Sequence, residues 1–341
     1  MNGYRIPLSV LDVAPVVRGA TPADAFRNSG EMVQVAERLG YKRFWVAEHH
    51  NMPSIASASP PVLLAHLGAL TSTIRLGSGG VMLPNHAPMT VAEQFGILEG
   101  LYPGRIDLGI GRAPGTDPLT AQALRRSTQA VGADDFPEQL TQLLGFFEGE
   151  FPPGHPFAKI TAVPARGQKP ELWILGSSTY GAQAAALLGL RYSFAYHFAP
   201  AMVDDAVAVY RRTFRPSIDL EQSYLMMGAS VICGENDEHA QWLAKPGKIA
   251  FLSMAQGRSE PYVTPEEAAD YRLTGYEQQV VDDWSRAHII GGPATVSSQL
   301  DALLERTGAE ELIIGNVVWP FEERVASFER LAGLYSLTPA S

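Results

Sequence analysis

The chain has 341 residues, 46% of them hydrophobic, which is enough to bury one large core. Lysine and arginine total 26 against 36 aspartate and glutamate, a net charge of −10 with no basic cluster, so nucleic acid and anionic membranes are not expected partners. The single cysteine, Cys233, excludes an internal disulfide and a cysteine-rich metal site, and no apolar run approaches the ~20 residues that span a bilayer. We therefore expect a cytoplasmic protein without an N-terminal leader.

The first third of the chain alternates predicted strands and helices. Thr21-Pro22 opens the first helix with a cap residue followed by proline, and Gly40 ends it. Further helices are predicted near residues 60–71 and 90–101. The apolar runs that predict strands cover residues 6–12, 43–47, 74–83 and 105–111.

The remainder continues the alternation but contains two long interruptions. Residues 113–136 are polar and too long for a bare connection, which predicts an insertion that could close over a ligand. No convincing strand occurs between Gly234 and Gly291, which predicts a second insertion. The proline-rich segment 151–170 indicates a small hairpin. Strands are predicted at residues 172–175, 192–195, 225–233 and 312–315, and helices near 136–148, 180–188, 200–214, 295–306 and 322–335.

Eight short strands that alternate with helices predict an α/β fold of one domain over residues 1–341. We expect a (β/α)8 TIM barrel with insertions after strands 4 and 7, because no low-complexity linker divides the chain. An open doubly wound sheet is the alternative. In both architectures ligands bind at the carboxyl ends of the strands, so binding and catalytic residues are expected there.

Glycines interrupt the predicted third strand at Gly77, Gly79 and Gly80. Glycine inside a strand indicates that something approaches the backbone closely, and we interpret that as a flat ligand, with a simple bulge as the alternative. The fourth strand ends in Gly111-Arg112, where a guanidinium beside exposed amide groups could hold a phosphate. A salt bridge is the alternative role for this arginine.

The second and fifth predicted strands also end in polar residues. The fifth leads through Ser177 and Ser178 into an alanine-rich helix, and hydroxyls at a helix start serve either as a phosphate cradle or as ordinary caps. The second leads into Glu48-His49-His50. His49 can carry a proton near neutral pH, while Glu48 can hold one imidazole in its tautomer. Because no third ligand accompanies the two histidines, we expect no metal.

Three further polar residues are candidates for other roles. Asp107, between apolar neighbours in the fourth strand, needs a partner if it faces the barrel interior, and Arg105 and Arg112 are both candidates. His86 follows the glycine-rich strand and could contact substrate or cap the next helix. His197, at the end of the sixth strand, is a weaker candidate.

Four motifs at predicted strand ends carry a family resemblance: WVAEHHN at 45–51, GSGGVMLPNHAP at 77–88, PGRIDLGIGRAPGTD at 103–117 and LGSS at 175–178. Over nearly the whole chain the sequence resembles the bacterial luciferase-like flavin-dependent monooxygenases, in particular their alkanal-monooxygenase-like group. The resemblance implies a TIM barrel that binds FMN, receives it reduced from a separate flavin reductase, and forms a homodimer.

The resemblance also implies roles for individual residues. His49 corresponds to the catalytic imidazole, Arg112 and Ser177 to phosphate ligands, and Gly79-Gly80 to a non-prolyl cis peptide beneath the isoalloxazine ring. The light-emitting members carry a cysteine where this chain has Gly111, which weakens an inference of bioluminescence. They carry an acidic residue where it has Gly176, which leaves the phosphate pocket simpler here than in the emitters. The expected cofactor-binding set is Ser78, Gly79, Gly80, Arg112, Gly176, Ser177 and Ser178.

The implied reaction is oxidation of a small organic substrate, by resemblance an aldehyde, with reduced FMN and O2 through a flavin peroxide. Two other functions stay open: a hydride-transfer reductase that uses a deazaflavin, and a flavin-binding protein without turnover. His49 argues against the last, because a storage protein needs no titrating group beside the ring.

Overall fold

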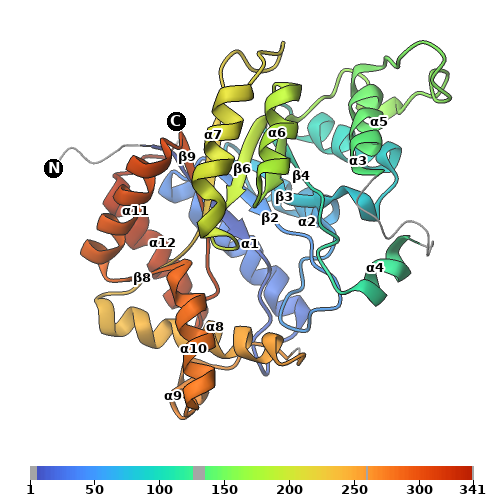
Figure 1. Cartoon of the computed structure of the whole chain (residues 1–341). Coiled ribbons are helices and arrows are strands. Elements are labelled where there is room, and N and C mark those ends of the chain that lie inside the picture. Colours follow the sequence, from blue (N-terminus) through green and yellow to red (C-terminus); the bar gives the residue numbers. More distant parts are fainter. Residues whose placement is uncertain (1–5, 126–134, 259, 340–341) are drawn as a thin grey trace.

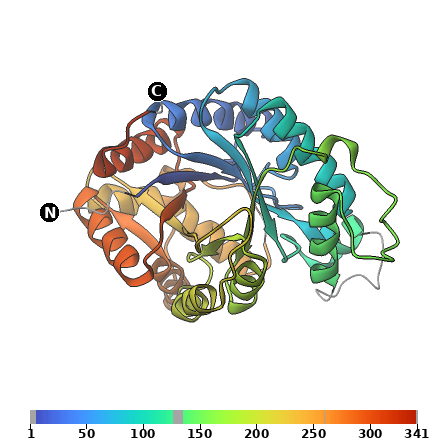
Figure 2. The ribbon, with the colours of Figure 1, turned by 90° about the horizontal axis from the view of Figure 1, so that it is seen from above.

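The computed structural model describes residues 6–125, 135–258 and 260–339, and one parallel sheet of nine strands organises them. The strands are β1 (Leu8–Asp12), β2 (Arg43–Val46), β3 (Arg75–Met82), β4 (Ile106–Gly111), β5 (Glu171–Gly176), β6 (Arg191–Ala195), β7 (Leu225–Cys233), β8 (His288–Gly291) and β9 (Glu311–Gly315). β1 to β7 and β9 close into a ring, because β6 pairs with β7 and β9 pairs back to β1 (Figure 2). The predicted TIM barrel is confirmed.

Most of the helices surround this ring on the outside, and the others lie at its lower end in Figure 1 (Figures 1 and 2). The helices are α1 (Pro22–Leu39), α2 (Pro60–Ala69), α3 (Pro88–Leu101), α4 (Pro118–Arg125), α5 (Phe136–Glu148), α6 (Thr179–Leu188), α7 (Val203–Thr213), α8 (Asp237–Ala255), α9 (Pro265–Ala269), α10 (Gly275–Arg286), α11 (Pro293–Thr307) and α12 (Phe321–Tyr335). The start and stop predicted for α1 are confirmed. Thr21 and Asp24 form a reciprocal capping box, and Gly40 ends the helix with φ 85°.

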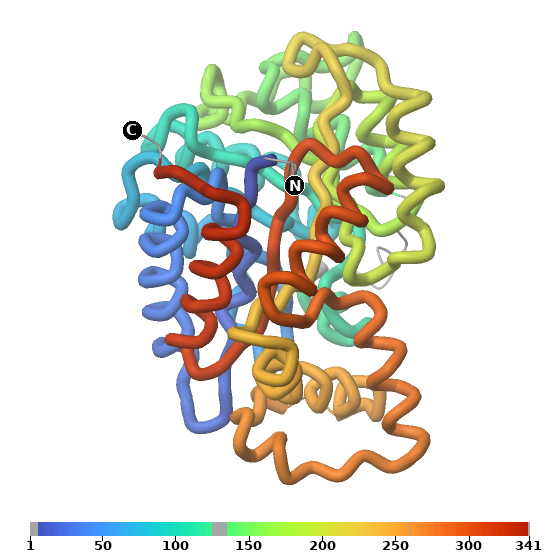
Figure 3. The backbone as a smooth tube through the Cα atoms, turned by 90° about the vertical axis from the view of Figure 1, so that its left-hand side faces the viewer, coloured from blue at the N-terminus to red at the C-terminus, as the bar shows by residue number. Residues whose placement is uncertain are grey.

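The two predicted insertions both occur, and the second contains a strand that we did not predict. β8 pairs in parallel with the last four residues of β7, Ser230 to Cys233. Four residues directly after α10 are too few for a periodic pattern to separate a strand from the end of a helix. α8, α9 and α10 lie at the same end of the barrel as β8, the lower end in Figures 1 and 3. In the first insertion α4 is described, whereas residues 126–134 lie outside the described residues.

The hairpin predicted for residues 151–170 is wrong. This segment consists of turns and one short 3-10 helix, η3 (Val163–Ala165). Proline has no amide hydrogen to give to a strand ladder, so a proline-rich segment cannot pair regularly. Among the described residues, none of the helices combines the length and the apolar character that crossing a membrane requires.

Aromatic and charged side chains fill the interior of the barrel. Trp45 and Trp173 pack edge to face with ring centres 5.3 Å apart. Towards the amino-terminal ends of the strands, the buried guanidinium of Arg43 lies 2.8 Å from Asp107 and 2.7 Å from Glu311. Arg75 Nε donates to Asp107 as well, at 2.9 Å. The interior therefore ends in an ionic layer at this side of the barrel.

The partners predicted for Asp107 are wrong. Arg105 stands before β4 and donates to the carbonyl oxygens of Ile74 and Thr71 instead. Arg112 follows β4 at its other end. Arg43 and Arg75 reach Asp107 because they are register partners at the start of β2 and β3. Pairing between strands that are distant in sequence decides this contact.

Candidate functional site

The residues predicted to form the site follow neighbouring strands and meet at the carboxyl end of the barrel. His49 comes just after β2, Gly79-Gly80 lie in the second half of β3, Arg112 follows β4, and Ser177 follows β5. Since these strands are parallel neighbours in the order β2-β3-β4-β5, their carboxyl ends form one continuous rim.

His49 presents an imidazole that favours its neutral form. Its backbone amide donates to the carbonyl of Ser57 at 2.9 Å, which fixes the loop, while its Nδ1 is buried with no hydrogen-bond partner among the described residues. Burial lowers the pKa of His49 from its usual 6.5, more than the nearby Glu48 carboxylate raises it. His50 and His197 lower this pKa further. His49 is thus suited to accept a proton near pH 7.

Glu48 is fully buried and accepts hydrogen bonds from several groups at once. His50 Nε2 lies 3.0 Å and His86 Nε2 2.9 Å from Oε1, and the Met82 amide lies 3.0 Å from Oε2. Burial alone raises the pKa of Glu48, but these hydrogen bonds outweigh it and lower the pKa to about 2. The carboxylate is therefore ionised. It holds two imidazoles, neither of which is that of His49.

These contacts decide whether His86 caps α3, and they give Glu48 a larger role than the sequence indicated. His86 does not cap α3, because the cap position is Ala87 and carries no side-chain cap bond. Its Nε2 is committed to Glu48. The signal for Glu48 was an acidic residue directly after a buried strand and before two histidines. Nothing in the sequence indicated that Met82 and His86, in the loop after β3, would donate hydrogen bonds to Glu48.

The glycines of β3 are required by the protein itself. A Cβ on Gly79 would lie 2.5 Å from Leu11 Cδ1, and one on Gly80 would lie 2.7 Å from the carbonyl oxygen of Gly109. The close approach that we interpreted as a flat ligand is therefore made by neighbouring side chains and strands. The Ser78 hydroxyl is buried, donates to the Gly109 carbonyl at 2.9 Å and accepts from the Gly109 amide at 3.0 Å. The cis peptide between Gly79 and Gly80 is present as expected.

Arg112 meets the start of α6, and we call Arg112, Ser177, Ser178 and the first turn of α6 the phosphate corner. The exposed Arg112 guanidinium lies 4.1 Å from the ring centre of Tyr180, in the first turn of α6. Ser178 occupies the cap position, yet its side chain makes no cap hydrogen bond. In the described part of the chain Arg112 pairs with no carboxylate. A free guanidinium beside an uncapped helix start fits a phosphate group.

Two more histidines, His197 and His288, have lowered pKa values. His197 Nδ1 lies 3.1 Å from the carbonyl oxygen of Gly228, and burial lowers the pKa of His197. His288 stacks on Trp284 with ring centres 3.6 Å apart, and burial lowers its pKa to about 4. The sequence indicated His197 weakly and gave no signal for His288, whose strand was not predicted. Within the described ranges no group of three or more histidine, cysteine or acidic side chains could hold a metal ion.

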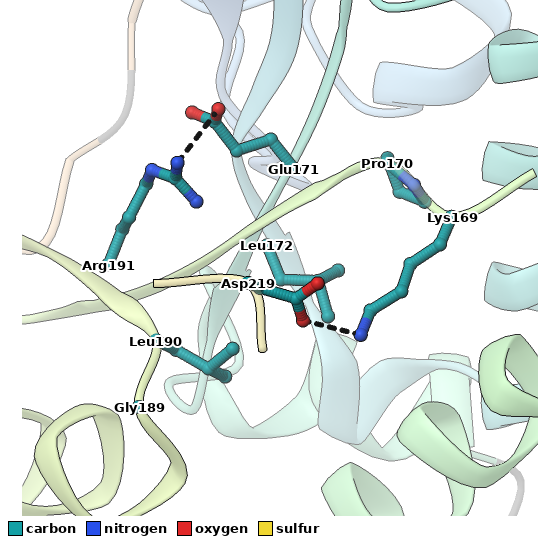
Figure 4. A pocket seen from close by; sticks show the side chains of 8 residues that line it. All are labelled: Lys169, Pro170, Glu171, Leu172, Gly189, Leu190, Arg191 and Asp219. Carbon is teal, nitrogen blue, oxygen red and sulfur yellow. Dashed lines mark hydrogen bonds and ion pairs between the residues drawn. The ribbon is translucent and has the colours of Figure 1, made fainter. Parts of the chain in front are cut away.

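A polar cavity of about 230 Å³ opens at the opposite end of the barrel, at the starts of β5 and β6 (Figure 4). The charges that face it are already paired: Lys169 lies 2.6 Å from Asp219, and Arg191 lies 3.3 Å from Glu171. None of the predicted site residues lines this cavity. The carboxyl rim, and not this cavity, is the candidate functional site.

Comparison with known proteins agrees with the barrel fold and identifies the family. A family model described as luciferase-like monooxygenase matches residues 8–311. A protein of Escherichia coli K12 named luciferase-like monooxygenase is 41% identical over 329 residues, which cover 96% of this chain and 97% of that protein. An N-acetyl-S-alkylcysteine monooxygenase of Bacillus subtilis is 45% identical over 191 residues, 56% of this chain and 57% of that protein.

A solved structure is similar over the whole fold. The crystal structure of apo-MsnO8 superimposes with a TM-score of 0.89 at 36% sequence identity, and the match covers 99% of each chain. The family model, the full-length relative and this structure all confirm the resemblance carried by the four motifs. The chain belongs to the luciferase-like monooxygenase family.

Proposed function

We propose that this protein is an FMN-dependent monooxygenase that oxidises a small organic substrate with O2. The observation that carries the proposal is the phosphate corner, where Arg112 lies against Tyr180 beside the uncapped start of α6. A flavin mononucleotide has one phosphate that such a corner would hold. Gly176, Ser177 and Ser178 would line its phosphate side. Gly79 and Gly80 would support its ring through the backbone, together with that of Ser78.

The protein groups at the rim control position, water and protons. When bound, reduced FMN supplies the electrons and the reaction with O2. His49, neutral because its pKa is lowered, would accept a proton from the reacting groups, and its lack of a protein partner at Nδ1 supports that role. The described parts of the insertions after β4 and β7, α4 and α8 to α10, would limit water access to the rim.

Two features of the proposal come from the family. A separate flavin reductase would supply the reduced cofactor, and two copies of the chain would form a homodimer. The substrate would be an aldehyde, as the alkanal-monooxygenase-like motifs imply, or a thioether, since a relative is named for N-acetyl-S-alkylcysteines. Screening both classes separates them.

The decisive experiment mixes anaerobic protein and photoreduced FMN rapidly with oxygenated buffer and follows the flavin spectrum. We expect a transient absorbing species that outlives the reaction of free reduced FMN, and faster decay when the correct substrate is added. Reoxidation at the free-flavin rate contradicts an oxygen-activating site. A parallel titration with a deazaflavin tests the hydride-transfer alternative, which gains support if the protein binds the deazaflavin and not FMN.

A further inference from the structure

Three rim loops carry the separate parts of the candidate site. Residues 48–51 after β2 hold His49, residues 82–86 follow the Gly79-Gly80 peptide, and residues 112–117 after β4 begin with Arg112. Each loop leaves a different strand, so strand pairing alone does not fix their mutual positions. The buried carboxylate of Glu48 accepts hydrogen bonds from the first two loops. The backbone carbonyl of Glu48 packs against the third loop.

The side chain of Glu48 accepts from four N–H groups. The imidazoles of His50 and His86 and the Met82 amide lie 2.9 to 3.0 Å from it, and Asn85 Nδ2 lies 3.3 Å away. An ionised carboxylate can only accept hydrogen bonds. His50 and His86 must therefore both carry a hydrogen on Nε2, which leaves Nδ1 as the acceptor nitrogen when each ring is neutral.

The third loop, residues 112–117, is hydrogen-bonded to the two loops that hold the Glu48 carboxylate. Asn85 Nδ2 donates to the Pro114 carbonyl at 2.8 Å, and Thr116 Oγ1 donates to the His50 carbonyl at 2.8 Å. A Cβ on Gly115 would lie 2.8 Å from the carbonyl oxygen of Glu48, so this loop packs directly on the Glu48 backbone. Movement of the carboxylate would thus loosen all three loops together.

We propose that Glu48 is a positioning residue that fixes the tautomers of His50 and His86 and sets His49 and the Gly79-Gly80 peptide against the phosphate corner. The inference rests on the proposed function for its catalytic meaning. Its structural content, two Nε2–H imidazoles and three joined loops, belongs to the protein without cofactor. The two can therefore be tested separately.

The test compares wild type with Glu48→Gln and with a matched control, Glu311→Gln. Glu311 is equally buried and accepts several hydrogen bonds, but it lies at the opposite end of the barrel. A carboxamide oxygen replaces two carboxylate oxygens in Glu48→Gln, so at least one of the four donors loses its acceptor or one imidazole changes tautomer.

Three measurements decide the outcome. Nitrogen-15 NMR of histidine-labelled protein without cofactor, assigned with His50→Asn and His86→Asn, should show both rings as Nε2–H in the wild type. In Glu48→Gln either one ring changes tautomer or amide hydrogen exchange rises in residues 82–86 and 112–117, and FMN binds about tenfold more weakly. Glu311→Gln should leave the tautomers and FMN affinity unchanged.

Other outcomes refute specific parts. A wild-type Nδ1–H tautomer at either ring overturns the inference, whether or not Glu48→Gln folds. Unchanged tautomers and loop exchange in folded Glu48→Gln overturn it too, as do equal effects of Glu311→Gln. If wild type shows the expected tautomers but binds no FMN, the positioning role stands and the proposed function fails.

Discussion

Replacing Arg112 with alanine should weaken the binding of FMN much more than the binding of riboflavin. The two ligands differ only in the phosphate, and Arg112 is the basic side chain at the phosphate corner. Hydrogen bonds from a charged donor to an anion contribute about 1.5–3 kcal/mol, and solvent screening at the exposed Arg112 favours the lower half of that range. We therefore expect about a 10- to 40-fold increase in the Kd for FMN.

Fluorescence titration of each flavin measures the effect. Dividing the change in the Kd for FMN by the change in the Kd for riboflavin separates the loss of phosphate binding from any disturbance of the site that holds the flavin ring. Arg112→Lys should fall between wild type and alanine, because lysine keeps the charge but loses the forked geometry and the stacking on Tyr180. Arg212→Ala, an exposed arginine on α7, is the control for net charge. An equal loss for FMN and riboflavin would refute the assignment of the phosphate to Arg112.

Three other changes have defined expected outcomes. His49→Ala should abolish substrate oxidation while FMN affinity stays within about threefold, since its proposed role is proton transfer and not anchoring. His288→Asn should reduce acid sensitivity. Its folded pKa of about 4 lies below the usual 6.5, so the unfolded state binds more protons and stability falls as the pH drops from 6.5 to 4, by on the order of 3 kcal/mol. Gly80→Ala should lower the free energy of unfolding by about 1–3 kcal/mol, because the added Cβ meets the Gly109 backbone.

Each of these has its own check. Equal loss of FMN binding and turnover in His49→Ala would make that residue structural. Urea unfolding at pH 7 and pH 4.5 measures the His288 effect, and a pH dependence identical to wild type contradicts it. Gly100→Ala is the control for Gly80, because nothing lies within 4 Å of its added Cβ and alanine favours the helix. A Gly80→Ala protein as stable as wild type would show that the strands shift apart at little cost.

The barrel could be predicted because each of its strands is an apolar run between turn signals. β8 could not be predicted, because it has only four residues and a single residue separates it from the preceding helix. The identity of the residues around Asp107 could not be predicted either, because Arg43 and Arg75 precede it by 64 and 32 positions and only strand register brings them to it. Local sequence predicts elements well and contacts between them poorly.

The candidate site shows the same division. His49 and Arg112 could be predicted because each follows a buried strand and has chemistry suited to a rim. Glycines in β3 were a true signal of crowding, but the sequence could not say that Leu11 and Gly109 cause it. The role of Glu48 depends on hydrogen-bond donors from the next loop, among them His86. The spacing of these residues in the sequence does not predict that they meet at Glu48.

The ionic layer around Arg43, beneath Trp45 and Trp173, closes one end of the barrel. A ligand among the carboxyl ends of the strands would then enter and leave from that side of the barrel. If the flavin lies deeper than the substrate, it must enter first and leave last, so substrate bound early would block it. We therefore expect ordered binding, with substrate inhibition that rises when reduced flavin is scarce.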